Sequence, residues 1–323
     1  MRRLLYGAVG IAMVAPFLYM VSVSFMGESE LLRWPPPLLP AAPTTGNYAA
    51  ALEALPYTRV LFNTAILAGC VMIGQVLTSA AAGYALARLR FPGRDRMGTT
   101  LLAMLAIPAI LLVIPRYLMI EALGWVDTYP GLISTELVSV WGILLMRQAF
   151  VMLPREVEDA ARLDGAGEWT LFWRVTLPLT RPAVAALAML AFMDQWRNFL
   201  WPLVVTRSAR MEVAEVALAH FHTAYASNWP YQMAAAVLVT LPVLVVCLLA
   251  QRYVIEGVRY TGARVRLKRL AADPNVTDQS RSAVVPPGHS TNACPLSRRF
   301  TVHATSDLQA LMRMPRGIAM VTA

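Results

Sequence analysis

The sequence predicts an all-α integral membrane protein with six transmembrane helices. Of its 323 residues, 57% are hydrophobic and 15% are charged, whereas soluble domains usually carry about 25% charged residues. The mean hydropathy is +0.53. The apolar runs are too long for the strands of a barrel, and a helix satisfies its own backbone polar groups inside hydrocarbon. Clusters of arginine lie between the runs, as expected of loops at a membrane surface.

Six apolar runs approach the roughly 20 residues that a helix needs to cross the hydrocarbon. They cover residues 4–25, 61–83, 98–119, 131–151, 183–205 and 233–251, of which the fourth and fifth are the least apolar. Several prolines fall inside or at the ends of the runs, namely Pro16, Pro108, Pro115, Pro202 and Pro242. Neighbouring helices can satisfy the carbonyls that a proline frees, so we expect kinks at these positions and not breaks.

The basic residues lie mainly in alternate loops. They gather at the N-terminus, in the connections 88–96 and 147–181, and after residue 252. Because cytoplasmic loops carry the excess of Lys and Arg, both termini are predicted to face the cytoplasm. This topology accounts for the net charge of +9, and no basic stripe interleaved with aromatic residues indicates nucleic acid. A cleaved signal peptide is the alternative for the first run, but its length and the missing Ala-x-Ala site favour a retained helix.

A polar segment, residues 153–178, separates the fourth and fifth runs. Its sequence, LPREVEDAARLDGAGEWTLFWRVTLP, predicts two short helices, one from Pro154 to about Leu163 and one over about 168–175. Proline suits the first turn of a helix. The intervening stretch 164–167 contains two glycines, which permit a sharp change of direction. The segment is therefore predicted to be a helical hairpin outside the bilayer.

The first of these short helices has a small face and a charged face. Val157, Ala160 and Ala161 recur at spacings of three and four, and small residues let the backbone of another protein approach closely. The charged residues at the rim can pair with a partner; they are Arg155, Glu158, Asp159 and Arg162. The alternative is an amphipathic helix on the membrane surface. The acidic residues Glu156, Glu158 and Asp159 argue against contact with anionic lipid.

The spacing within this segment resembles the cytoplasmic EAA loop of ABC-importer permeases. That pattern is Glu-Ala-Ala, three residues, Gly, nine residues, Ile, one residue, Leu-Pro, and the matching positions here are Asp159-Ala160-Ala161, Gly165, Val175 and Leu177-Pro178. Further stretches resemble the second half-permease of carbohydrate importers of the maltose-permease type. They are Gly83–Arg88 with Phe91–Gly93, Leu123–Thr128, Trp196–Leu203, and Gln251–Tyr253 with Gly257 and Gly262.

The resemblance implies the fold of a type I ABC importer permease. Residues 1–60 would form the first transmembrane helix and an external Pro-rich segment, and residues 61–256 the permease core with the loop 153–178. Residues 257–323 would form a cytoplasmic tail, which its composition predicts to be disordered after about residue 270. After about residue 270 the tail departs from the family, whose members usually end near that point.

The resemblance also implies a function and partners. The chain would be a multi-pass, lipid-embedded subunit of the bacterial inner membrane that moves a sugar or oligosaccharide into the cytoplasm. It would work with two ATP-binding subunits, a second permease subunit and an extracytoplasmic solute-binding protein. The ATP-binding subunits would hydrolyse ATP with Mg, and this chain would bind no cofactor and no nucleic acid.

In the family, the first short helix of the loop sits in a cleft of the ATPase. By this resemblance the ATPase-coupling residues are Glu158, Asp159, Ala160, Ala161, Asp164, Gly165, Leu177 and Pro178. Asp159 stands where the family has Glu, which keeps the charge but shortens the reach by one methylene. The links on either side of the hairpin are short, so movement of the helix would be transmitted to the adjacent spans.

Ionisable residues inside a membrane are costly and usually face a partner or a cavity. Glu136, Asp194 and Arg197 are such residues. Asp194 and Arg197 lie three apart, which predicts an intrahelical ion pair, with a lining role in the sugar path as the alternative. The candidate substrate path consists of Asp194, Gln195, Trp196 and Asn198. Interfacial anchoring would equally explain the tryptophans in this region. Arg197 and Asn198 replace an Asn and an acidic residue of the family.

The sequence predicts no catalytic chemistry. A phosphate-binding loop needs a lysine, and the one lysine of the chain is Lys268 in a basic flank. The pair Gly165-x-Gly167 lacks the third glycine and the preceding strand of a dinucleotide site. No residues lie at metal-ligand spacing. The prediction is therefore a non-enzymatic subunit, with a self-contained secondary transporter or channel as the alternative, although no repeat relates the two halves of the chain.

Overall fold

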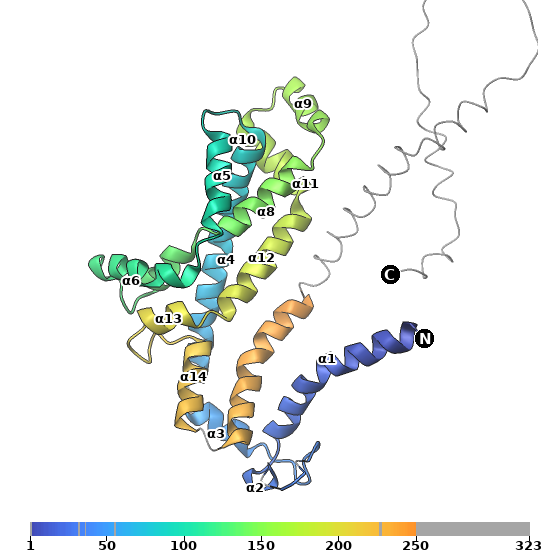
Figure 1. Ribbon diagram of the computed structural model, residues 1–323, viewed down its shortest axis with the longest axis vertical. Coiled ribbons are helices and arrows are strands. Elements are labelled where there is room, and N and C mark those ends of the chain that lie inside the picture. The colour runs from blue at the N-terminus through green and yellow to red at the C-terminus, as the bar shows by residue number, and fades with distance from the viewer. Residues whose placement is uncertain (1, 32, 36, 55, 226–227, 250–323) are drawn as a thin grey trace, which may run out of the picture. The chain divides into compact units, whose positions relative to one another are not determined.

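The structure is a computed structural model that describes residues 2–31, 33–35, 37–54, 56–225 and 228–249 (Figure 1). Every regular element within these ranges is a helix, in agreement with the predicted all-α class. The predicted tail and the closing segment 251–262 lie outside the described residues. The helices of the N-terminal part are α1 (Arg2–Ser24), α2 (Glu28–Leu31), α3 (Gly46–Ala54), α4 (Tyr57–Arg88), α5 (Arg94–Met104), η1 (Ala109–Leu112) and α6 (Val113–Ala122).

The remaining helices follow α6 and end with the last predicted span. They are α7 (Tyr129–Ile133), η2 (Ser134–Glu136), α8 (Val140–Val151), α9 (Arg155–Leu163), α10 (Glu168–Thr170), the π-helix η3 (Leu171–Thr176), α11 (Leu177–Leu179), α12 (Arg181–Trp196), α13 (Leu200–Val205), α14 (Ala214–Ala224) and a helix over Trp229–Leu249.

Three of these helices are long and apolar enough to cross a membrane without a bend. They are Leu5–Ser24 within α1, α4, and Trp229–Leu249, and they correspond to the first, second and sixth predicted runs. Three further candidates are bent pairs of helices: α5 with η1 and α6 at 98°, α7 and η2 with α8 at 45°, and α10 to α11 with α12 at 77°. If each bent pair crosses once, the number of spans is up to six.

The expectation of a kink at Pro108 is wrong, because the chain breaks there. After α5 the amides of Leu105, Ala106 and Ile107 donate to carbonyls three residues back, which tightens and ends the helix. Pro108 is extended, with φ −61° and ψ 127°. Proline has no N–H to continue the ladder and disfavours helical backbone at the preceding residue. Pro16, in contrast, lies within the uninterrupted helix α1.

The fifth predicted run also divides. Helix α12 ends at Trp196, and residues 200–205 form the separate helix α13. The amides of Arg197 and Asn198 donate to the carbonyls of Met193 and Gln195, so the last turn of the helix closes at these two polar residues. The predicted apolar run over residues 183–205 therefore contains most of one membrane helix and a separate short helix beyond it.

Helix α4 packs against α8 and α12, which run alongside it (Figure 1). The contact with α8 depends on glycine. A Cβ atom on Gly83 would lie 2.8 Å from the backbone nitrogen of Arg147, and one on Gly142 would lie 2.5 Å from Oγ of Ser79. Lipid exerts no hydrophobic force between helices, so close backbone contact supplies much of their attraction. The two glycines therefore set the distance between α4 and α8.

An aromatic cluster continues this packing at the end of α4. Tyr84, Phe150 and Phe172 come from α4, α8 and η3, and all three are buried. The ring centroid of Tyr84 lies 5.6 Å from that of Phe150 and 5.1 Å from that of Phe172. Aromatic pairs at such distances add to the stability gained by burial. The cluster fixes the base of the polar segment 153–178 to the membrane helices.

The Pro-rich segment after α1 is held by the buried side chain of Glu30 and the half-buried side chain of Asn47. The carboxylate of Glu30 accepts hydrogen bonds from the amides of Ala41 and Ala42 at 3.3 and 3.2 Å. Asn47, at the start of α3, donates to the carbonyls of Ser24 and Met26. These contacts tie the segment back to the end of α1.

Replacement of Gly83 tests the close contact of α4 and α8. Gly83→Ala should lower the stability of the protein by about 1–3 kcal/mol, because the added methyl group meets backbone atoms. Gly69→Ala is the matched control on the same helix, since a Cβ there has no neighbour within 4 Å. Thermal unfolding in detergent compares the two variants. Equal midpoints for both would contradict the contact.

Candidate functional site

Helix α9 forms the predicted first half of the polar hairpin, and its ends follow from the local sequence. Pro154 is extended and immediately precedes the first turn, which holds Glu156 and Glu158, while Arg162 lies in the last turn. Both charge placements complement the helix dipole. Gly165 has φ +84°, and the amides of Gly165 and Ala166 donate to the carbonyls of Arg162 and Ala161. This is a glycine-dependent C-cap, so the predicted turn after Asp164 is confirmed.

One side of α9 is exposed. Asp159 has 68% of its side chain exposed, and Leu163 is 90% exposed. Val157, Ala160 and Asp164 are exposed as well, while Ala161 is half-buried. Trp169, in the second half of the hairpin, is 74% exposed. The surface thus combines small, apolar and acidic groups, which is the composition that a protein partner can cover.

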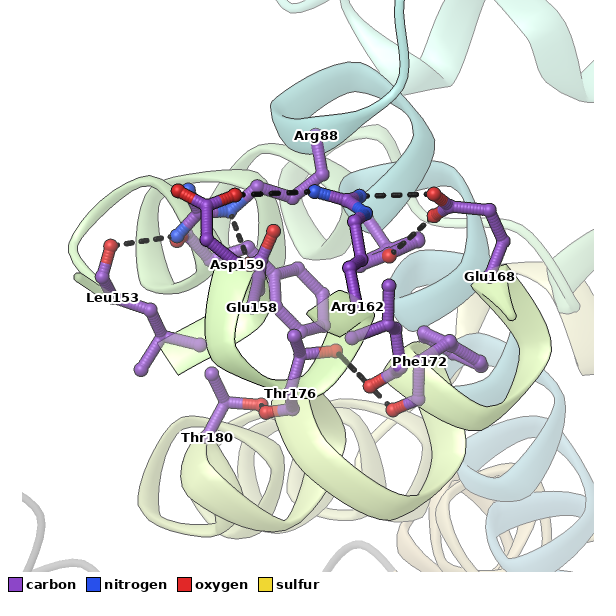
Figure 2. A network of polar contacts seen from close by, with 12 residues as sticks. Arg88, Leu153, Glu158, Asp159, Arg162, Glu168, Phe172, Thr176 and Thr180 are labelled. Atoms are coloured by element: carbon purple, nitrogen blue, oxygen red, sulfur yellow. Dashed lines mark hydrogen bonds and ion pairs between the residues drawn. The ribbon is translucent and has the colours of Figure 1, made fainter. Parts of the chain in front are cut away.

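The other side of α9 is anchored to the membrane helices through Glu158 (Figure 2). Its carboxylate lies 3.0 Å from Nε of Arg88, and the two side chains are 5% and 4% exposed. These atoms are at ion-pair distance but outside hydrogen-bond geometry. The same guanidinium donates to the carbonyl of Leu153 at 2.7 Å and to that of Phe150. Glu158, expected at the rim of the docking face, therefore points into the protein.

A second polar network crosses the hairpin. The hydroxyl of Tyr84 donates to Glu168 at 3.0 Å, and Arg162 donates to the other carboxylate oxygen of Glu168 at 2.9 Å. Arg162 also lies 3.7 Å from Asp159 (Figure 2). The hydrogen bond with Glu168, despite partial desolvation, raises the pKa of Arg162 above its ordinary value. Asp159 thus already has a loosely held cationic neighbour within its own chain.

The second half of the hairpin is less regular than predicted. The expected helix over 168–175 is a single α-turn followed by the π-helix η3. The buried hydroxyl of Thr176 donates to the carbonyls of Leu171 and Phe172, which occupies acceptors inside the π-helix. Leu177 and Pro178 form α11, and Thr180 ends it by donating to Thr176 and Leu177. The chain then turns by 77° into α12.

The ionisable residues of the spans pair differently from the expectation. Within the residues that the structure describes, no ion pair joins Asp194 to Arg197. Glu136 instead forms an ion pair with Arg116. The guanidinium of Arg116 also lies 4.3 Å from the ring centroid of Trp201. Sequence reasoning missed Arg116, although an acidic residue in one span is a signal to search neighbouring spans for a cation.

The candidate substrate-path residues fall into two groups. Gln195 is buried, donates to Glu136 at 3.4 Å and accepts from Asn198 at 3.0 Å, so these residues form one polar cluster. Asp194 is exposed on the same helix. Trp196 is buried and donates to the carbonyl of Val239, and Trp201 donates to that of Leu132. The two indole rings are therefore packed inside the protein.

Comparison with known proteins identifies relatives that match about three quarters of the chain. Residues 75–260 match the family described as binding-protein-dependent transport system inner membrane component. The chain is 32% identical over 256 residues to the sn-glycerol-3-phosphate transport system permease protein UgpE of Rhizobium meliloti (strain 1021), with 76% of this chain and 91% of the relative covered. It is 34% identical over 254 residues to the arabinooligosaccharides transport system permease protein AraQ of Halalkalibacterium halodurans, with 78% of this chain and 91% of that relative covered.

A solved structure shows the same fold. It is described as a bacterial ABC transporter involved in the import of the acidic polysaccharide alginate. One of its chains superposes with a TM-score of 0.67 at 24% sequence identity, covering 78% of this chain and 94% of that chain.

These findings confirm the resemblance that the polar hairpin predicted, and they favour a permease subunit over a self-contained secondary transporter or channel. The fold is that of a type I ABC importer permease. The chain belongs to the family of binding-protein-dependent transport system inner membrane components and is a multi-pass, non-catalytic permease subunit of an ABC importer.

Proposed function

We propose that this permease moves a sugar or oligosaccharide into the cytoplasm, together with two ATP-binding subunits, a second permease subunit and an extracytoplasmic solute-binding protein. The observation that carries the proposal is α9, whose outer side is exposed while its inner side is fixed by a buried ion pair. A helix built this way can accept force from a partner and pass it on. The partners hydrolyse ATP with Mg, and this chain binds no cofactor.

The docking surface consists of the exposed part of the hairpin. Asp159, Ala160 and Asp164 face outward, and half-buried Ala161 lines the edge of this surface. Gly165 sets the direction in which the chain leaves the helix. Leu177 and Pro178 connect the hairpin to α12. Glu158 contributes from the inner side, by holding α9 to Arg88. The arginine distribution supports a cytoplasmic position for this surface and for both termini.

The named solutes of the relatives support a polyhydroxylated cargo. One relative is named for sn-glycerol-3-phosphate transport and another for arabinooligosaccharides. In this chain, Asp194 and Gln195 near the end of α12, and Asn198 just beyond it, supply carboxylate and amide groups, and such groups can bond sugar hydroxyls. The indole of Trp196 is buried and donates to the carbonyl of Val239, so this residue supports the path by packing. We assign these groups to a permease core that spans residues 61–256 of the sequence.

Co-purification tests the assignment of partners. A tagged chain, expressed with the other subunits, should be extracted from membranes together with an ATPase and a second permease. Proteoliposomes that hold the complete complex should take up solute when ATP is supplied. Solute transport by the isolated chain, without any ATPase, would contradict the proposal.

Reversal of the charge at position 159 tests the docking surface. Asp159→Lys should reduce ATP-dependent uptake by about tenfold or more, because a misplaced charge at a protein interface costs several kcal/mol. Membrane insertion should be unaffected, since the side chain is largely exposed. Glu121→Lys is the control, an exposed acidic residue at the end of α6 away from the hairpin. Normal uptake by the Asp159→Lys variant would contradict docking through this face.

Replacement of Gly165 tests the hinge. At φ +84° a side chain costs about 1–2 kcal/mol, although a Cβ there meets no neighbour within 4 Å. Gly165→Val should therefore redirect the end of α9 and lower uptake without loss of membrane-inserted protein. Gly167→Val is the matched control, because Gly167 has φ −75° and equally open space. Equal uptake by the two variants would show that the left-handed turn is dispensable.

A further inference from the structure

The C-terminal residue of α4, Arg88, meets three acceptors, which lie in α8, in the link between α8 and α9, and in α9. Its guanidinium pairs with the carboxylate of Glu158 on α9 and donates to the carbonyls of Phe150 and Leu153. Phe150 lies in the last turn of α8, and Leu153 lies in the link between α8 and α9. The contacts thus join the end of α4 to the end of α8 and to α9 at one point, and the two hydrogen bonds span sequence separations of 62 and 65 residues.

The chemistry of this point requires arginine. The last carbonyls of a helix have no partner within the helix, and Arg88 satisfies one from α8 together with one from the following link. Both of these hydrogen bonds come from Nη2 of the planar guanidinium, and its Nε faces Glu158. Lysine has one compact ammonium group on a flexible stem and cannot span the three acceptors with the same fixed geometry.

Burial indicates what the pair contributes. Both side chains are at least nine-tenths buried, and a buried ion pair often adds little net stability compared with apolar residues of similar size. Removal of one partner, however, leaves an uncompensated buried charge. A pair of this kind holds two elements in one relative position more than it stabilises the fold. Here the two elements are the helix that carries the docking surface and the longest membrane helix, α4.

Without this contact, α9 would be joined to the spans mainly through its flanking links. The link to α8 consists of residues 152–154, and the other passes through the Gly165 turn and the π-helix. Arg88 adds a direct connection to α4, which itself packs against α8 and α12. Displacement of α9 therefore acts on α4 at its end, where the three spans are in contact.

We propose that Arg88 and Glu158 are positioning residues for transport: their ion pair transmits movement of α9 to α4, so that ATP hydrolysis in the partner drives the rearrangement of the spans. The inference rests on the proposed docking of α9 on an ATPase. It names the route by which the docked helix moves the membrane part, and α4 is the first element on that route.

The test uses the complete transporter in proteoliposomes and measures the number of ATP molecules hydrolysed per solute molecule transported. The variants are Arg88→Lys, Arg88→Gln and Glu158→Gln. Arg96→Gln is the control, since its exposed side chain forms no ion pair with the described residues. Co-purified ATPase and the amount of inserted permease are measured for every variant. A merely structural role would lower the amount of complex but not change this ratio.

Arg88→Lys and Glu158→Gln should keep the ATPase bound and hydrolysing ATP, while uptake falls by about tenfold, within the range typical of coupling between sites. The ratio of ATP hydrolysed to solute moved should rise accordingly, and Arg96→Gln should leave it unchanged. If Arg88→Gln does not insert, the two milder variants decide. An unchanged ratio in variants that retain the ATPase would overturn the proposed transmission alone. Absence of ATPase from the unaltered transporter would overturn the docking and the transmission together.

Discussion

The close contact between α4 and α8 is the constraint on which the candidate site depends. Gly83 and Gly142 let the two helices approach until a Cβ on either would overlap its neighbours. This approach brings Arg88, five residues beyond Gly83, beside the last carbonyls of α8 and within reach of Glu158. A wider spacing would separate the guanidinium from these acceptors. Packing inside the membrane thus determines where the polar hairpin is held outside it.

The hairpin divides its charges according to burial. Arg88 and Glu158 are inaccessible and hold one geometry, whereas Asp159, Arg162 and Glu168 lie in a partly exposed network. Exposed ion pairs contribute roughly 0–1 kcal/mol, so Asp159 can exchange Arg162 for a cation on a partner at little cost. The inner ion pair holds α9 rigidly to α4, and the outer network lets Asp159 exchange one cationic partner for another. A helix that is proposed to couple two proteins needs both properties, and α9 has both.

Much of the fold and part of the candidate site could be predicted from the sequence. The long apolar runs gave α1, α4 and the last helix, because hydropathy and length suffice where a span is straight. The glycine turn of the hairpin was predictable because only glycine readily adopts φ +84°. The break at Pro108 and the pairing of Glu136 with Arg116 were not, since both depend on which helices become neighbours. For the same reason Arg88 was counted only as a basic flank.

We propose that an ATPase covers the outer side of α9, and protection of a thiol tests this contact most directly. The chain's three cysteines are replaced by serine, and a single cysteine is introduced at Ala160, which is exposed, or at Glu121 as a control. Labelling by a water-soluble maleimide is compared with and without the purified ATPase. Binding of the ATPase should slow labelling at position 160 and leave position 121 unchanged. Equal labelling rates at position 160 in both states, with the ATPase bound, would contradict the account.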